Sequence, residues 1–253
     1  MSSINVFVLS LGIVLEVCLL SCLLRRGEWK VYPYFFSFAL WMVVRSISFF
    51  PAQRLSATAY RNFYWGSDTV DIVLRFLIVW EVFRHVFPKD SGLHNLAAKG
   101  FKAVAITVTA FAVGAFWSYE TYTHFHSVYP ALERVFGFAQ AVLILSILAA
   151  ARYYELPLGR NISGIALAFG AWASMSTANN AMIDLRHSFL PYWQLLRPLS
   201  FVAMLGMWTW AMWSYAPNPR IEVDPAADPI ANLSQWTDGW EQATSTVRRV
   251  IHP

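Results

Sequence analysis

The sequence is poor in charge and nearly free of cysteine. Only 13% of its 253 residues are charged, whereas 57% are hydrophobic and the mean hydropathy is +0.43. Soluble domains carry about 25% charged residues, so this composition favours a membrane protein. Its two cysteines, Cys18 and Cys22, lie one helical turn apart in the first apolar segment. They can supply neither a disulfide framework nor a metal site.

Other missing residues exclude whole functional classes. The last apolar segment, 192–214, contains no lysine to carry a retinal Schiff base. No apolar segment holds the histidine ligands of a b-type haem or the clustered histidines and carboxylates of a membrane zinc hydrolase. Phosphate-binding glycine loops and nucleophile elbows are also missing. We therefore expect no cofactor. One weak alternative is a metal site at Glu120, His124 and His126.

Seven apolar segments come close to or exceed the roughly 20 residues that a helix needs to cross a bilayer. The first is not expected to be a cleaved signal peptide, because its leading MSSIN has no positive charge and Arg25 and Arg26 follow the apolar run. The sequence thus predicts an all-α, polytopic transmembrane domain over residues 1–215. Its expected spans are about 4–24, 33–50, 63–86, 101–118, 131–151, 161–182 and 192–214.

Lysine and arginine are distributed unequally between the two sets of loops. With the N-terminus outside, nine lie in cytoplasmic loops and three in outer loops. The positive-inside rule therefore predicts an N-out, C-in protein of the cell membrane, presumed to be a bacterial inner membrane. Because these basic residues are spread along the chain beside apolar segments, the net charge of +4 does not indicate nucleic-acid binding. The nine are Arg25, Arg26, Lys30, Arg84, Lys89, Lys99, Lys102, Arg152 and Arg160, and the three are Arg54, Arg61 and Arg186.

The chain after the last apolar segment, 216–253, is predicted to be a cytoplasmic tail. Asp228 and Pro229 match a helix N-cap and first helical position. Apolar residues follow at nearly helical spacing as far as Ile251. We expect an amphipathic helix over about 229–251 that lies on the inner membrane surface. The alternative is a weakly ordered tail.

Two stretches suggest an internal duplication. YWGSDTVDIVLRFLIVW at 64–80 and YWQLLRPLSFVAMLGMW at 192–208 have the same length, begin with Tyr-Trp and end in Trp. They predict two parallel three-helix units joined by the fourth segment, a 3+1+3 plan that is known among transporters. The alternative is coincidence in a chain that contains 12 tryptophans.

Charged residues lie inside the third segment. Asp68, Asp71 and Arg75 occupy positions i, i+3 and i+7, so they share one helix face. A rise of about 1.5 Å per residue places them roughly 6, 10 and 16 Å below the outer end of that segment. A charge at the bilayer centre costs roughly 2.5–3.5 kcal/mol, so such groups should face one another or a wet cavity. Glu81 faces the other way near the inner end, where we expect it to meet water.

Polar residues of four other segments fall at a similar depth, whereas Glu16 lies on the inner side of the middle. They predict a polar cavity in the outer half of the bundle. The sixth segment repeats small residues every four positions, at 166, 170, 174 and 178, which permits close helix approach. The alternative to a cavity is a structural network of charges that holds the bundle together. The candidate ligand-binding residues are Arg45, Asp68, Asp71, Arg75, Glu133, Gln140, Asn180 and Arg197.

Our first hypothesis is a membrane protein whose cavity binds a small polar or anionic ligand, for transport or for sensing. Arginines would hold negative groups, and Asp68 and Asp71 would orient them or exchange protons. The second hypothesis is a non-catalytic subunit of a larger membrane complex, or a homo-oligomer, with aromatic surfaces as contacts. An enzyme that uses one of the two aspartates as a base is a third possibility that no residue spacing singles out.

Overall fold

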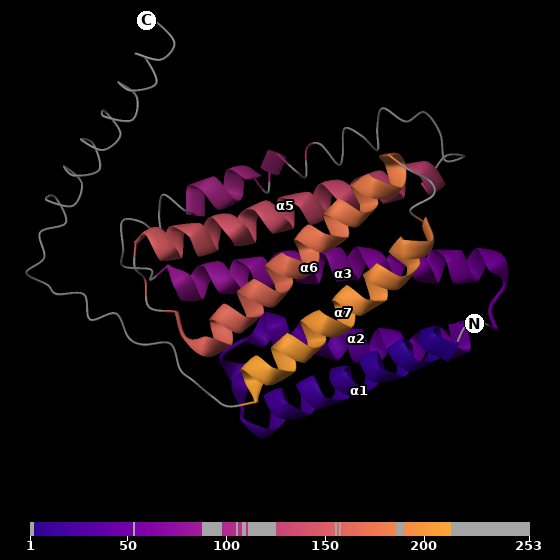
Figure 1. Ribbon diagram of the computed structural model, residues 1–253, viewed down its shortest axis with the longest axis horizontal. Helices are drawn as coiled ribbons and strands as arrows, with labels where there is room; N and C mark the ends of the chain where they lie inside the picture. Colours follow the sequence, from indigo (N-terminus) through magenta and orange to yellow (C-terminus); the bar gives the residue numbers. More distant parts are fainter. Residues whose placement is uncertain are drawn as a thin grey trace, which may run out of the picture. The chain divides into compact units, whose positions relative to one another are not determined.

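The computed structural model describes residues 3–52, 54–87, 98–104, 106–107, 110, 125–154, 156, 158–185 and 190–213. This described part is all-helical, which confirms the expected fold class. Its elements, drawn in Figure 1, are α1 (Ser3–Arg25), the short 3-10 helix η1 (Glu28–Lys30), α2 (Pro33–Ala52), α3 (Ala57–Val86), α5 (Phe125–Tyr153), α6 (Arg160–Leu185) and α7 (Leu190–Met212).

Six of the seven expected segments coincide with described helices. The fourth, 101–118, lies mostly outside the described residues, although 98–104 and 106–107 are helical. The expected tail helix at about 229–251 lies entirely outside them, as do the side chains of Glu120, His124 and His126. The helical content of the first, second, third, fifth, sixth and seventh segments was therefore predictable from apolar run length.

Local sequence signals account for several helix boundaries. The Ser56 hydroxyl caps α3 by accepting a hydrogen bond from the Ala59 backbone N–H at 3.3 Å. Pro33 begins α2, where its fixed φ suits the first helical turn and its missing N–H costs no hydrogen bond. Gly27, with φ 69°, makes the left-handed turn between α1 and η1 that a side chain would disfavour.

The six long helices close into a ring. Each packs against its two neighbours in the order α1, α2, α3, α5, α6, α7 and back to α1, and α3 also contacts α6. Helices α1, α3, α5 and α7 run in one direction, and α2 and α6 run in the other (Figure 1). One end of the ring, here called the N-terminal end, therefore holds the starts of α1, α3, α5 and α7 and the ends of α2 and α6.

The interior of this ring is strongly polarised along its length. Toward the opposite end it is filled by a hydrophobic core in which Trp208 of α7 is fully buried. The Trp208 ring meets Phe35 and Phe38 of α2 edge-on, with centroids 4.9 and 5.9 Å apart, and its Nε1 donates to the Ile165 carbonyl at 3.2 Å. Toward the N-terminal end most of the described buried side chains are polar: Ser67, Asp68, Asp71, Gln140 and Asn179.

Small residues let α6 approach both of its neighbours closely. A Cβ on Gly164 would lie 2.2 Å from the Ala211 Cβ of α7, and one on Gly170 would lie 2.8 Å from the Ile144 Cγ2 of α5. The small-residue repeat predicted the contact at Gly170 but not the closer one at Gly164. Its last member, Ala178, is exposed, so the repeat does not face a neighbouring helix along its whole length.

Length and apolar composition alone single out one described stretch that could cross a membrane, Val135–Tyr153 of α5. The apolar helix Pro33–Phe49 is shorter. The third helix is 30 residues long but carries Asp68, Asp71 and Arg75 in its middle.

Candidate functional site

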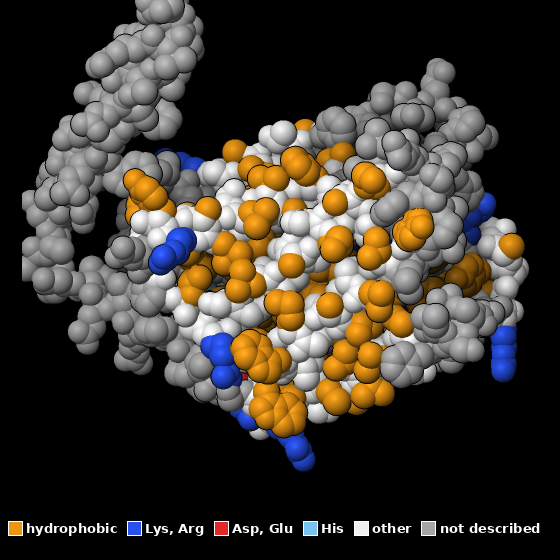
Figure 2. Space-filling view, viewed as in Figure 1, with side chains coloured by type: hydrophobic (Ala, Val, Ile, Leu, Met, Phe, Trp, Pro, Cys, Tyr) orange, Lys and Arg blue, Asp and Glu red, His pale blue; other side chains and the backbone are white. Residues whose placement is uncertain are grey.

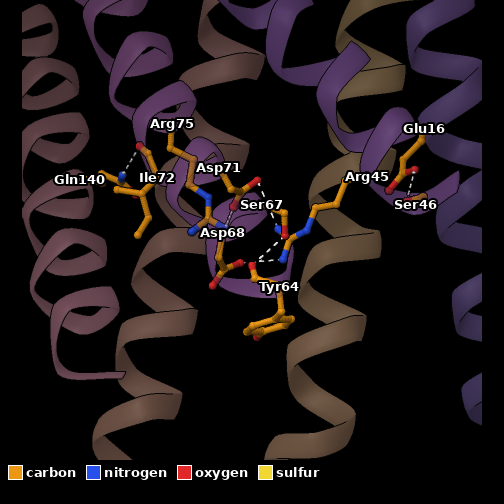
Figure 3. A network of polar contacts seen from close by, with 10 residues as sticks. All are labelled: Glu16, Arg45, Ser46, Tyr64, Ser67, Asp68, Asp71, Ile72, Arg75 and Gln140. Carbon is orange, nitrogen blue, oxygen red and sulfur yellow. Dashed lines mark hydrogen bonds and ion pairs between the residues drawn. The ribbon is translucent and has the colours of Figure 1, made fainter. Parts of the chain in front are cut away.

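Four charged side chains of α2 and α3 form one network in the polar half of the ring (Figure 3). Arg45 reaches from α2 to Asp68, with 2.6 Å between its Nη2 and Oδ1, and its Nη1 lies 3.6 Å from Asp71 Oδ1. Arg75, one turn along α3, pairs with the other oxygen of Asp71. Asp71 is thus held between two guanidinium groups from two helices.

The spacing of α3 explains why the network forms there. Asp68, Asp71 and Arg75 share the face of α3 that turns into the ring, and both aspartates are buried. Burying an unpaired carboxylate costs several kcal/mol, which is why each aspartate here contacts a guanidinium group. The structure thus brings these three residues together with Arg45, and their role in binding a ligand stays a prediction.

Aromatic rings cover both guanidinium groups. The Arg75 Cζ lies 4.4 Å from the centroid of Trp172 on α6, and the Arg45 Cζ lies 5.6 Å from that of Phe49 on its own helix. A cation over an aromatic face is stabilised by about 0.5–2 kcal/mol, with the larger values where water is excluded. Trp172, which the sequence analysis did not select, places the face of its ring against the Arg75 guanidinium.

Buried polar atoms on three different helices of the polar half have no hydrogen-bond partner among the described residues. They are Arg75 Nε, Gln140 Oε1 and Asn179 Nδ2. Gln140 of α5 is 1% exposed and donates through Nε2 to the Ile72 carbonyl of α3 at 3.5 Å (Figure 3). Asn179 of α6 is 4% exposed. Buried polar atoms are nearly always hydrogen-bonded, so the partners of these two donors and one acceptor are expected outside the described side chains.

A carboxylate that the depth argument set apart also belongs to this region. Glu16 of α1 is buried, and its Oε2 accepts a hydrogen bond from the Ser46 hydroxyl at 2.8 Å. Ser46 is the residue after Arg45 on α2, so Glu16 lies beside the network (Figure 3). The position of Glu16 relative to Arg45 depends on which turn of α1 packs against which turn of α2. The length of a helix does not define that register.

The remaining predicted site residues are only partly placed. Gln140 borders the network, and its inclusion is consistent with its contact to Ile72. Arg197 is half-buried on α7, where its carbonyl accepts a hydrogen bond from Ser200. Glu133 and Asn180 lie on α5 and α6, but their side chains are outside those described. Participation of these last three residues in the site stays a prediction.

Two further carboxylates are buried near the opposite end and have structural partners. The expectation that Glu81 meets water is wrong: it is 3% exposed and accepts hydrogen bonds from the first free backbone N–H groups of α2. Glu28 of η1 accepts a hydrogen bond from Asn161 Nδ2 of α6 at 3.3 Å. Burial raises the pKa of the Glu28 carboxyl above its usual value, against the opposing effects of Arg26, Asn161 and Arg160.

Comparison of the chain with protein-family models, with curated proteins and with solved structures gives no match. The described side chains contain no group of three or more histidine, cysteine or acidic residues placed to hold a metal ion. The polar half of the ring, with its paired charges and its unpartnered polar atoms, is therefore the feature from which a function can be inferred.

Proposed function

We propose that the chain is a seven-span, N-out, C-in protein of the inner membrane, whose outer half binds a small polar or anionic ligand for transport or sensing. The observation that carries this proposal is the reversal of the usual arrangement of a soluble protein. Ionisable groups in the middle of the described helices face the interior, and large apolar side chains face outward.

The outward surface supports the membrane part of the proposal. Val14, Ile47, Val73, Phe138 and Leu145 come from four helices and are each more than half exposed. Figure 2 shows hydrophobic side chains spread across the visible face, with Lys and Arg side chains toward the ends of the helices. Exposed apolar patches of this extent are unusual on soluble monomers and are expected where lipid covers the surface.

The polarised interior supports the ligand part. An apolar core fills the half of the ring toward the inner end, so it would block passage of water, whereas the outer half holds two arginines. Arg75 Nε and Asn179 Nδ2 can donate hydrogen bonds, and Gln140 Oε1 can accept one. Donors outnumber acceptors, which favours a ligand with carboxylate or phosphate oxygens that also carries a hydroxyl or amino group.

Topology is tested first, with single-cysteine variants in a background that lacks Cys18 and Cys22. Lys30 and Arg54 are both exposed and lie at opposite ends of α2. A membrane-impermeant thiol reagent applied to the outside of cells or spheroplasts should label Arg54→Cys and not Lys30→Cys. Labelling of Lys30→Cys alone would place the polar half on the cytoplasmic side and contradict the proposed orientation.

Ligand binding is tested on the purified full chain with a panel of small hydroxy- and amino-carboxylates, inorganic phosphate and sulfate. A bound compound should raise the melting temperature, and Arg75→Gln should weaken its binding at least tenfold. Arg84→Gln is the matched control, because it makes the same change on the same helix at an exposed position. Equal binding by wild type, Arg75→Gln and Asp71→Asn would contradict the proposed site.

One observation favours the alternative of a non-catalytic subunit in a larger complex. The network residues satisfy one another through ion pairs, as a purely structural network would. In that case no compound should bind, Arg75→Gln should lower stability, and a protein partner should copurify in mild detergent in stoichiometric amount. These outcomes differ from those expected for a ligand site.

A further inference from the structure

A buried carboxylate approaches the turn of α2 that carries Arg45 from the side opposite the α3 aspartates. Glu16 of α1 is 5% exposed and accepts the Ser46 hydrogen bond at 2.8 Å. In Figure 3 the Glu16–Ser46 pair lies on one side of Arg45, and Asp68 and Asp71 lie on the other. Arg45 therefore stands between acids that belong to two different helices.

The charged surroundings of Glu16 come from the elements that pack against α1, namely α2, α7 and η1. From α2, the positive charge of Arg45 acts on Glu16, although no ion pair joins the two among the described side chains. The stretch 198–212 of α7 contains no ionisable residue. Gly12 of α1 faces Val202 of α7, and both helices start at the N-terminal end. Arg197 precedes Val202 and Glu16 follows Gly12, so Arg197 lies closer to that end than Glu16 does. The other ionisable groups of these elements are Cys18, Cys22 and Arg25 of α1, Tyr34 of α2, Tyr192 of α7, and Glu28 and Lys30 of η1.

This environment favours the neutral acid. An ionised carboxylate buried with a hydroxyl as its hydrogen-bond donor loses several kcal/mol of solvation. The neutral form keeps an accepting oxygen for Ser46 and avoids that cost. Asp68 and Asp71 differ from Glu16 in this respect, because each of them contacts a guanidinium group directly.

We propose that Glu16 is a proton-binding site in the middle of the helix ring, and that its proton keeps Arg45 engaged with the aspartates of α3. When Glu16 releases its proton to water, a third carboxylate, in addition to Asp68 and Asp71, competes for the Arg45 guanidinium. That charge draws Arg45 toward α1 and weakens its hold on Asp68 and Asp71. Coupling of this exchange to a ligand rests on the proposed function, whereas the proton site itself does not.

Infrared difference spectroscopy of the full chain, reconstituted without ligand in vesicles of zwitterionic and anionic phospholipids, tests the proton site. The carbonyl stretch of a protonated carboxylic acid should be present near neutral pH and should be lost in Glu16→Gln. The same change at another buried carboxyl, Glu28→Gln, should leave that band in place. Ser46→Ala should keep the band but shift its frequency, because the carbonyl loses its hydrogen-bond donor.

Charge substitutions near Glu16 should move the pH at which the band disappears in opposite directions. Arg45→Gln removes a positive charge, so the band should persist to a higher pH, by about 1 unit or more. Asp68→Asn removes a negative charge, so the band should vanish at a lower pH. The proposal is overturned if a folded Glu16→Gln protein keeps the full band, or, where that variant does not fold, if Ser46→Ala and Arg45→Gln leave the band unchanged.

A ligand-binding failure is distinguishable from a failure of the proton site. The infrared measurement uses no ligand, so a Glu16 band that behaves as expected stands even if no compound in the panel binds. Conversely, a bound ligand whose affinity depends on Arg75 supports the proposed function even if Glu16 carries no proton.

Discussion

Glu81 of α3 caps the start of α2 from outside that helix, through a hydrogen bond of 2.7 Å from the Phe35 backbone N–H to its Oε2. The Tyr34 N–H donates to the other oxygen at 3.0 Å. A helix N-terminus carries unpaired N–H groups and a partial positive charge, and both favour a carboxylate at this place. One side chain thereby joins the third helix of the chain to the beginning of the second.

Replacing Glu81 by Ala should lower the stability of the purified protein by on the order of 3 kcal/mol, because two buried N–H groups lose their acceptors. Glu81→Gln keeps one accepting oxygen and should lie between wild type and the alanine variant. Arg84→Ala, one turn along α3 and exposed, is the control and should change little. Thermal unfolding in detergent measures the order, and a Glu81→Ala protein as stable as wild type would contradict the capping role.

The lengths of the apolar runs predicted where the helices lie in the sequence, but they could not predict which groups the buried charged side chains pair with. The expected span 63–86 ends where the helix Ala57–Val86 ends, although the helix begins earlier, and the i, i+3, i+7 spacing placed Asp68, Asp71 and Arg75 together correctly. Glu81 was misplaced because its depth suggested water, whereas the start of α2 covers it. The depth of a side chain along its helix follows from the sequence. The group that it contacts depends on which helices pack against each other.

The same limit explains why Glu16 was set apart from the site and why Trp172 was not selected. Glu16 lies on α1, which is separated from α3 by α2. Its proximity to Arg45 therefore depends on the contact between α1 and α2. Trp172 meets Arg75 because α6 crosses the ring to touch α3, a contact between residues about 100 positions apart in the chain. The sequence signal for Glu16 was a single carboxylate inside an apolar segment, but nothing in the sequence linked it to Ser46 and Arg45.

Gly164 should be intolerant of any side chain. Its Cβ would lie 2.2 Å from the Ala211 Cβ, so Gly164→Ala forces α6 and α7 apart and should cost about 1–3 kcal/mol or more. Gly206→Ala is the matched control, since no atom lies within 4 Å of its added Cβ, and helix propensity should raise stability by up to about 1 kcal/mol.

The compensating change sharpens this test. Ala211→Gly removes the atom that clashes, so the Gly164→Ala, Ala211→Gly double variant should recover most of the stability lost in the single variant. The melting temperatures of wild type, the two single variants and the double variant measure this recovery. A double variant no more stable than Gly164→Ala alone would argue against the close α6–α7 contact.

Trp172 should stabilise Arg75 through its ring face. We expect Trp172→Leu and Arg75→Gln to show a coupling energy of about 1–2 kcal/mol in a double-mutant cycle, because the Arg75 Cζ lies 4.4 Å from the ring centroid and both side chains are largely buried. Trp172→Phe keeps an aromatic face and should retain part of this coupling. Chemical or thermal unfolding measures it, and strictly additive losses would exclude the cation–π contact as a stabilising interaction.

Glu28 should make the stability of the protein depend on pH. Burial raises the pKa of its carboxyl in the folded state above that in the unfolded chain. The unfolded state therefore loses its proton first as pH rises, and the folded state becomes progressively less favoured until the folded-state pKa is passed. The stabilising contribution of the neutral Glu28 is complete below the unfolded pKa and is lost above the folded one.

Glu28→Gln removes this titration while keeping an oxygen that can accept the Asn161 hydrogen bond. Compared with wild type, the variant should be relatively more stable at pH 8 than at pH 4, by about 2–4 °C in melting temperature if the difference is about 1 kcal/mol. Asn161→Leu in both backgrounds is the control: it removes the donor to Glu28 and should enlarge the pH dependence in the Glu28 background alone. A pH profile that is the same for wild type and Glu28→Gln would mean that the Glu28 carboxyl titrates in the folded protein as it does in the unfolded chain.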